Sequence, residues 1–85
     1  MTITDALKLA VEELVRAEGK HHRFHSGHEG YAVLREELDE LWDAVKASKS
    51  YTHYADGPVI AEAVQVAAMA LRFLTNLCDD PKGTR

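Results

Sequence analysis

Apolar residues recur along the chain with the three- to four-residue period of amphipathic α-helices, and no stretch alternates in the manner of a β-strand. The pattern predicts three helices, at about residues 3–18, 27–47 and 58–78. Turn-forming residues separate them, and residues 79–85 are expected to form a loose C-terminal tail. The sequence therefore predicts one small all-α domain over residues 1–85.

Capping residues support the three helix starts. Thr2 or Thr4 can cap the first helix. Ser26 followed three residues later by Glu29 is the capping-box signature that opens the second. Asp56, followed by Gly57 and Pro58, is placed to cap the third.

The third predicted helix is apolar on nearly every side, which indicates burial on most of its faces. Two other helices cannot surround it, and a chain of 85 residues buries only a modest core. Tyr31 and Trp42 flank the apolar stripe of the second helix and are interpreted as core or subunit-interface residues. We therefore expect a small bundle of about three helices that is completed by oligomerisation, as a homodimer or homotetramer.

Net charge, apolar run length and cysteine content limit the expected partners and the expected cellular location. The formal net charge of −4 argues against a nucleic-acid partner, which calls for a basic patch. No uncharged apolar run reaches about 18 residues, so no membrane span is expected. Cys78 is the only cysteine and no signal peptide is apparent, which favours a reducing cytoplasm. Cys78 itself is expected to fill a small space in the core.

The candidate chemistry begins in the second helix, where five of the eight residues over 36–43 are carboxylates. Glu37 and Glu40 lie three residues apart and share a face at the margin of the apolar stripe. Ionised groups at such a margin lose water and repel each other unless a positive charge joins them. A divalent cation is one interpretation, and a solvated acidic face is the other.

The third helix carries a matching polar stripe of Glu62, Gln65, Arg72 and Asn76 on an otherwise apolar surface. Two helices that each offer carboxylates can hold Mg²⁺, which prefers oxygen ligands and often shares them with substrate phosphates. Such an ion would neutralise a polyphosphate and activate the attacking water. Arg72 would add charge near a phosphate or pair with Glu62.

The run Glu36-Glu37-Leu38-Asp39-Glu40, followed by Glu62 near the start of the next helix, resembles the paired metal motifs EExxE and ExxD of the MazG-like all-α nucleoside triphosphate pyrophosphohydrolases. The resemblance covers roughly residues 26–77. It implies a single MazG-like helical domain, an NTP or dNTP substrate, and Mg²⁺-dependent hydrolysis to the monophosphate and pyrophosphate. It also implies a dimer or a dimer of dimers, which would supply the further helix that members of the family have.

Matched residue by residue, Glu37, Glu40 and Glu62 are the metal ligands on which catalysis depends, and Glu36 is an outer ligand or support. Gln65 stands where the family has aspartate. Its amide oxygen can bind Mg²⁺ but carries no charge, so metal affinity should be lower.

Three histidines lie between the first two predicted helices, and a fourth lies in the first turn of the second: His21, His22, His25 and His28. Clustered imidazoles can bind zinc or nickel, but no cysteine or well-spaced carboxylate completes the set in the sequence. They are therefore interpreted as loop residues, with a transition-metal site as the lesser alternative. His28, Arg72 and Asn76 are the candidate substrate-binding residues.

Two functions from different classes follow. The first is a cytoplasmic Mg²⁺-dependent nucleotide pyrophosphohydrolase, in which Glu37, Glu40 and Glu62 hold the cation. The alternative is a non-catalytic helical oligomer of the same fold that binds a nucleotide or a protein, which Gln65 in place of the aspartate suggests.

Overall fold

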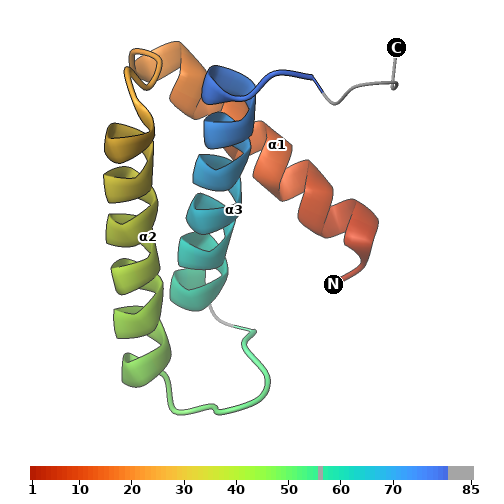
Figure 1. Cartoon of the computed structure of the whole chain (residues 1–85). Coiled ribbons are helices and arrows are strands. Elements are labelled where there is room, and N and C mark those ends of the chain that lie inside the picture. Colours follow the sequence, from red (N-terminus) through yellow and green to blue (C-terminus); the bar gives the residue numbers. More distant parts are fainter. Residues whose placement is uncertain (56, 81–85) are drawn as a thin grey trace.

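The computed structural model describes residues 1–55 and 57–80, and within these ranges it contains three helices and no strand. The helices are α1 (Ile3–Lys20), α2 (Gly27–Ala47) and α3 (Gly57–Leu77) (Figure 1). The all-α prediction is confirmed for this part of the chain, and each observed helix end lies within two residues of the expected one.

Two of the sequence-based expectations cannot be compared with the fold. The capping role of Asp56 lies outside the described residues, as do residues 81–85 of the loose tail expected over 79–85.

The first two helices begin at the predicted caps. The Thr2 hydroxyl accepts the backbone N–H of Asp5 (3.0 Å), and the Ser26 hydroxyl accepts that of Glu29 (3.1 Å). The Glu29 carboxylate reaches back to the backbone N–H of His25 (2.7 Å), one residue before the cap itself. A cap of this kind stabilises a helix by about 1 kcal/mol.

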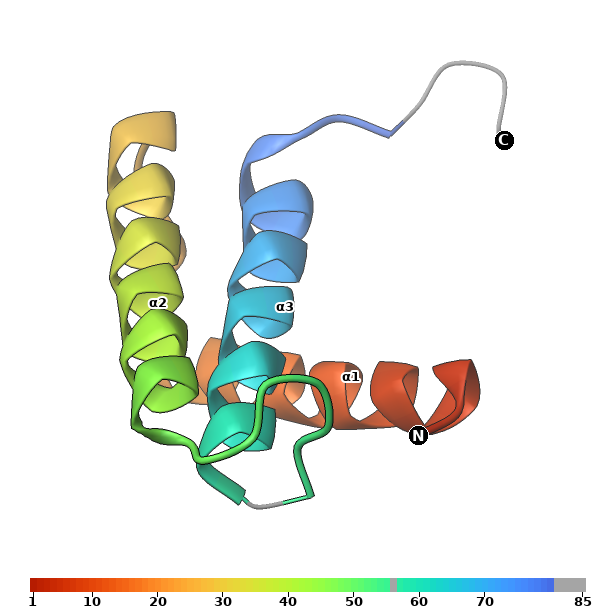
Figure 2. The same cartoon turned by 90° about the horizontal axis from the view of Figure 1, so that it is seen from below.

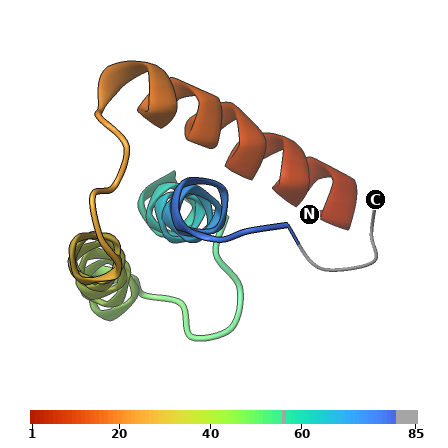
Figure 3. The same cartoon turned by 45° about the horizontal axis from the view of Figure 1, so that its top comes forward.

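The three helices are arranged around α3. The antiparallel helix α2 packs on one side of α3, and α1 crosses its other side at a steep angle (Figures 1 and 2). Helices α1 and α2 do not pack against each other, and the view in Figure 3 shows α3 between them. Every helix–helix interface within the described chain therefore includes α3.

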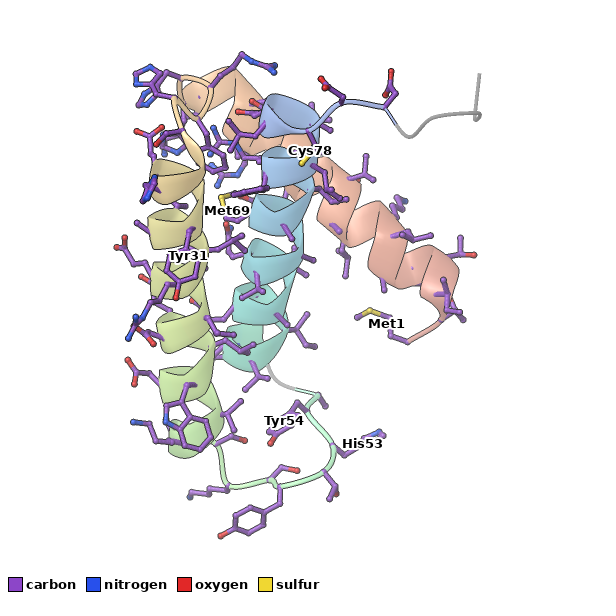
Figure 4. All side chains as sticks on the ribbon, in the orientation of Figure 1. Met1, Tyr31, His53, Tyr54, Met69 and Cys78 are labelled. Carbon is purple, nitrogen blue, oxygen red and sulfur yellow. The ribbon has the colours of Figure 1, made fainter. Side chains whose placement is uncertain are left out.

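The core lies where α3 meets the turn between α1 and α2. Its buried members are small or flexible apart from one aromatic ring: Ala17, Phe24, Ala68 and Met69. Met69 points from α3 toward α2 (Figure 4). Partly buried apolar side chains from all three helices surround this group: Leu14, Val33, Leu34, Phe73 and Leu77.

Close packing of α2 on α3 depends on Gly30. A Cβ atom at this position would lie 2.7 Å from Cδ2 of Phe73 and 3.2 Å from Cδ2 of Phe24. Both contacts are with aromatic rings of the core, which can move only if the core repacks. Gly30 therefore sets the distance between the two helices.

The apolar residues outnumber the positions that one chain can bury. On α3, the positions Ala63, Ala67, Ala70 and Leu74 are exposed and recur at helical spacing, so they form one open stripe. Large apolar side chains are also exposed on the other two helices: Ile3, Leu7, Val11 and Val15 of α1, and Tyr31, Leu38 and Trp42 of α2. A single chain thus leaves α3 uncovered on one side.

Cys78 corrects one expectation. It lies just beyond α3 with its side chain exposed, and does not fill the core. The helix ends at Leu77, and the chain leaves the bundle there. A buried Cys78 would require α3 to continue for another turn.

By length and composition alone, α3 is long and apolar enough to span a membrane. In the described part of the chain, no other helix is. The central helix of a helical bundle passes the same test. Glu62 and Arg72 lie within α3, and charged groups at membrane depth are costly. The expectation that no segment spans a membrane stays a prediction.

Replacing Gly30 with alanine should destabilise the fold by about 1–3 kcal/mol, because the added methyl group displaces the Phe73 ring. Urea denaturation followed by circular dichroism measures the change. Gly19 of α1 is the matched control, since nothing lies within 4 Å of its Cβ position. Gly19→Ala should be neutral or stabilising by up to about 1 kcal/mol. Equal effects from both substitutions would contradict the role given to Gly30.

Candidate metal centre

The antiparallel packing of α2 and α3 brings together three carboxylates from the two acidic motifs. Glu37 and Glu40 share a face of α2, and Glu62 lies in the second turn of α3. One ligand oxygen from each residue lies within 4.8 Å of the other two. The helical spacing and the antiparallel return of the chain therefore place these predicted ligands in a single cluster.

The cluster strongly perturbs one of its acids. The pKa of Glu37 is raised to about 7, first because the carboxyl is partly buried, and then because the charge of Glu40 and a hydrogen bond with Glu40 favour the protonated form. The charges of Glu62 and Glu36 raise it further. Near neutral pH, the metal-free cluster thus holds a proton that an isolated glutamate would have released.

Glu62 supplies the observation that best separates a cation site from a solvated acidic face. Its Oε2 atom is buried, and no described residue forms a hydrogen bond with it. A buried carboxylate oxygen without a partner is costly, since it has lost water and gained nothing in return. A cation at this position would remove the cost at Glu62 and the repulsion at Glu37 together.

The spacing of the oxygens is compatible with a small hard cation if the carboxylates draw closer together. Two oxygens bound to one Mg²⁺ are about 3.0 Å apart when adjacent and about 4.2 Å apart when opposite, because each Mg–O bond is about 2.1 Å long. The three ligand oxygens lie within 4.8 Å of one another, so binding one ion would bring them closer together. The side chain of Glu40 is exposed, whereas those of Glu37 and Glu62 are partly buried, so Glu40 is the ligand with the most freedom to move.

The remaining predicted ligands occupy different positions. Glu36 is exposed on α2 and acts on the cluster through its charge, which helps to raise the pKa of Glu37. Gln65 is one turn beyond Glu62 and lines a groove between α1 and α3. There its amide also faces Glu13. A hydrogen bond from Gln65 helps to lower the pKa of the Glu13 carboxyl.

The first helix contributes residues that sequence reasoning missed. Arg16 donates from Nε to Oε1 of Glu13 (2.9 Å) and from its terminal nitrogen to Oε2, and this pairing is the main reason that the pKa of Glu13 is lowered. The spacing of the two residues predicts such a pair on any helix. Nothing in that spacing says that the pair faces Gln65, since this depends on how α1 crosses α3.

The groove beside this pair has a volume of about 410 Å³, within the range of small-molecule sites. Its walls combine apolar side chains with the charged groups of α1: Leu9, Glu12, Glu13, Arg16, Gly57, Ile60, Ala61, Val64 and Gln65.

The polar stripe of α3 divides into two parts. Arg72 is ten positions beyond Glu62, which is about 15 Å along the helix axis. It is only 3% exposed, and its Nε lies 3.8 Å from Oε2 of Glu18, so its ionic partner is Glu18 and not Glu62. Asn76 accepts the backbone N–H of Phe24 (2.8 Å) and donates to Oε1 of Glu18 (2.7 Å).

Arg72 and Asn76 therefore have structural partners in the single chain, while His28 is exposed in the first turn of α2. The substrate-binding role of these three residues stays a prediction. None of them belongs to the carboxylate cluster.

Comparison of the chain with protein-family models, curated proteins and solved structures found no match in any of the three. The MazG-like assignment stays a prediction that depends on the two acidic motifs.

The raised pKa of Glu37 predicts how stability depends on pH. Between the ordinary glutamate pKa of 4.5 and about 7, the folded chain holds a proton that the unfolded chain has released. In EDTA, this group therefore stabilises the fold below pH 4.5, and the contribution is lost as the pH rises through 7. The effect cannot exceed about 1.4 kcal/mol per pH unit, the value for one proton.

Thermal unfolding of the wild type, Glu37→Gln and Glu36→Gln across this pH range measures the effect. Glu37→Gln should remove this component of the slope, while the exposed neighbour Glu36 should alter it little. All three proteins share the remaining ionisable groups, so only the difference between them is informative. A slope that Glu37→Gln leaves unchanged would show that this carboxyl does not hold the proton.

Proposed function

We propose that the chain is a Mg²⁺-dependent nucleoside triphosphate pyrophosphohydrolase, which converts a (d)NTP and water to the (d)NMP and pyrophosphate. The observation that carries the proposal is the buried, unpartnered oxygen of Glu62 beside the carboxylates of Glu37 and Glu40. The resemblance to the MazG-like enzymes supplies the reaction.

In this proposal, Glu37, Glu40 and Glu62 bind the cation through one oxygen each. Bound Mg²⁺ would offset the charge of the triphosphate and activate the attacking water. Glu36 adds negative charge from the solvent side, and Gln65 supplies a neutral amide oxygen one turn beyond Glu62. The proton held by Glu37 is released when the cation binds, because a metal ligand must be deprotonated.

The reaction needs no nucleophilic side chain, since phosphoryl transfer depends mainly on positioning and on electrostatic stabilisation. The groove between α1 and α3 is the candidate site for the nucleoside: Gln65 lines it, and its walls include Leu9, Ile60 and Val64. The substrate contacts predicted for Arg72, Asn76 and His28 are not required for this proposal.

We further propose that the active form is a homodimer or homotetramer. The exposed stripe of α3 and the exposed apolar side chains of α1 and α2 support it, as does an apolar groove of about 200 Å³ between α1 and α3. A reducing cytoplasm, where an exposed thiol such as Cys78 persists, is the proposed location.

Pyrophosphate release from a panel of NTPs and dNTPs, with Mg²⁺ or with EDTA, tests the activity. Release should require Mg²⁺. Glu40→Gln and Glu62→Gln should each lower kcat by at least about 100-fold, because even the loss of a group that merely supports a metal ligand costs 10- to 100-fold. Asp39→Asn is the matched control: it removes a charge from the exposed side of the same helix.

Circular dichroism must show that all three variants keep the helical content of the wild type. Full activity in both Glu40→Gln and Glu62→Gln would refute the metal assignment, whatever the substrate.

The alternative is a non-catalytic oligomer of the same fold that binds a nucleotide or a protein, and Gln65 in place of the aspartate favours it. Gln65→Asp distinguishes the two functions through turnover. The new carboxylate should strengthen Mg²⁺ binding whether the chain is an enzyme or a binding module. An enzyme weakened by Gln65 should also gain turnover. A gain in Mg²⁺ affinity without any pyrophosphate release would favour the binding module.

A further inference from the structure

A second cluster of metal-ligating side chains lies at the N-terminal end of α2, where the turn after α1 leads into the first turn of α2. His22, His25 and Glu29 each offer one ligand atom within 4.8 Å of the others. The two imidazole rings are stacked, with centroids 4.6 Å apart, and Nε2 of His22 lies 3.3 Å from Oε2 of Glu29. The carboxylate that the sequence pattern lacks is therefore supplied by the helix cap.

The backbone that carries these histidines is fixed to α3. Arg72 donates from its guanidinium to the His22 carbonyl oxygen (2.8 Å), and Asn76 accepts the backbone N–H of Phe24 (2.8 Å). Arg23 donates to the last carbonyl groups of α3, those of Thr75 (3.2 Å) and Asn76 (3.1 Å). The turn is thus held at His22, Arg23 and Phe24, the last of which directly precedes His25.

Phe24 also fixes the turn, through its side chain. Its ring is buried in the core, and the Arg72 guanidinium lies 4.3 Å from the ring centroid. The histidine side chains on either side remain exposed. A fixed backbone with exposed imidazoles is a pre-organised arrangement, because binding a ligand costs little ordering of the chain.

Glu29 is oriented as well. Its Oε1 accepts the backbone N–H of His25 (2.7 Å), which leaves Oε2 directed at His22. Carboxylates that bind metals are commonly oriented by such a second hydrogen bond. The hydrogen bond to the His25 backbone, and then that to His22, lower the pKa of Glu29, so the carboxylate is ionised at neutral pH.

We propose that His22, His25 and Glu29 form a site for a divalent transition metal of the zinc class, with its fourth position open to water. Nitrogen and carboxylate ligands about 2.0–2.1 Å from a tetrahedral zinc ion are about 3.3 Å apart, which matches the separation of His22 and Glu29. His25 completes the set when its ring rotates out of the stack.

The donor set separates this site from the carboxylate cluster. Two imidazoles and one carboxylate select zinc-like ions, whereas three carboxylates at Glu37, Glu40 and Glu62 suit a hard cation. The metal would join the turn to the first turn of α2 and act as a staple, which small domains often use. The site does not depend on the proposed hydrolase activity.

Calorimetric titration of the tag-free protein with Zn²⁺, in excess Mg²⁺ to occupy the carboxylate cluster, tests the proposal. One equivalent of Zn²⁺ should bind. His22→Ala and His25→Ala should each weaken binding at least about 10-fold, as should Glu29→Gln, which retains the capping hydrogen bond. His21→Ala, in the same turn, and His53→Ala, in the loop after α2, are the controls and should bind as the wild type does.

Thermal unfolding provides a second readout. Zn²⁺ should raise the Tm of the wild type and of both controls, but not that of His22→Ala or His25→Ala. The proposal is overturned if His22→Ala and His25→Ala together leave Zn²⁺ affinity unchanged, or if the control substitutions weaken it equally.

Discussion

The close approach of α2 to α3 is the constraint on which the rest of the structure depends. Gly30 allows it, because any side chain at this position would meet the rings of Phe73 and Phe24. The same approach closes the core around Met69, and it directs the acidic face of α2 toward the start of α3. Since α1 packs against no helix of the described chain other than α3, no other helix pair could compensate for a change in this distance.

The packing of α2 on α3 also forms two separate polar clusters, one of carboxylates and one of imidazoles with a carboxylate. At the middle of α2, three carboxylates share a partly buried space, and their mutual repulsion is relieved by a proton on Glu37. Near the beginning of α2, imidazoles and a capping carboxylate meet at a turn that Arg72 fixes to α3. The main feature of the first cluster is repulsion between its carboxylates. The main feature of the second is a backbone held in place by hydrogen bonds to α3.

Features that depend on neighbours in the sequence could be predicted. The period of apolar residues gives the three helices, the Thr2 and Ser26 caps follow from their spacing to the next polar residue, and Glu37 and Glu40 share a face by helical geometry. The pairing of these acids with Glu62 was expected from two acidic motifs on adjacent helices, and the three carboxylates do lie together.

Features that depend on the crossing of α1 could not be predicted. A helical wheel places Glu62, Gln65, Arg72 and Asn76 on one stripe, but it does not show that Glu18 of α1 engages the last two. Nor does it show that Glu29, a cap by sequence, also faces His22. The wheel gives the direction of a side chain, whereas its partner depends on the angle between helices.

The central claim is that a divalent cation occupies the space between Glu37, Glu40 and Glu62. Calorimetric titration of the wild type and Glu62→Gln with Mg²⁺ tests it most directly, at a pH above about 7, where the proton on Glu37 no longer competes. The account predicts saturable binding by the wild type and its loss in Glu62→Gln. Equal affinity in the two proteins would show that the buried oxygen of Glu62 is not a ligand, and the three acids would then be a surface feature without a metal.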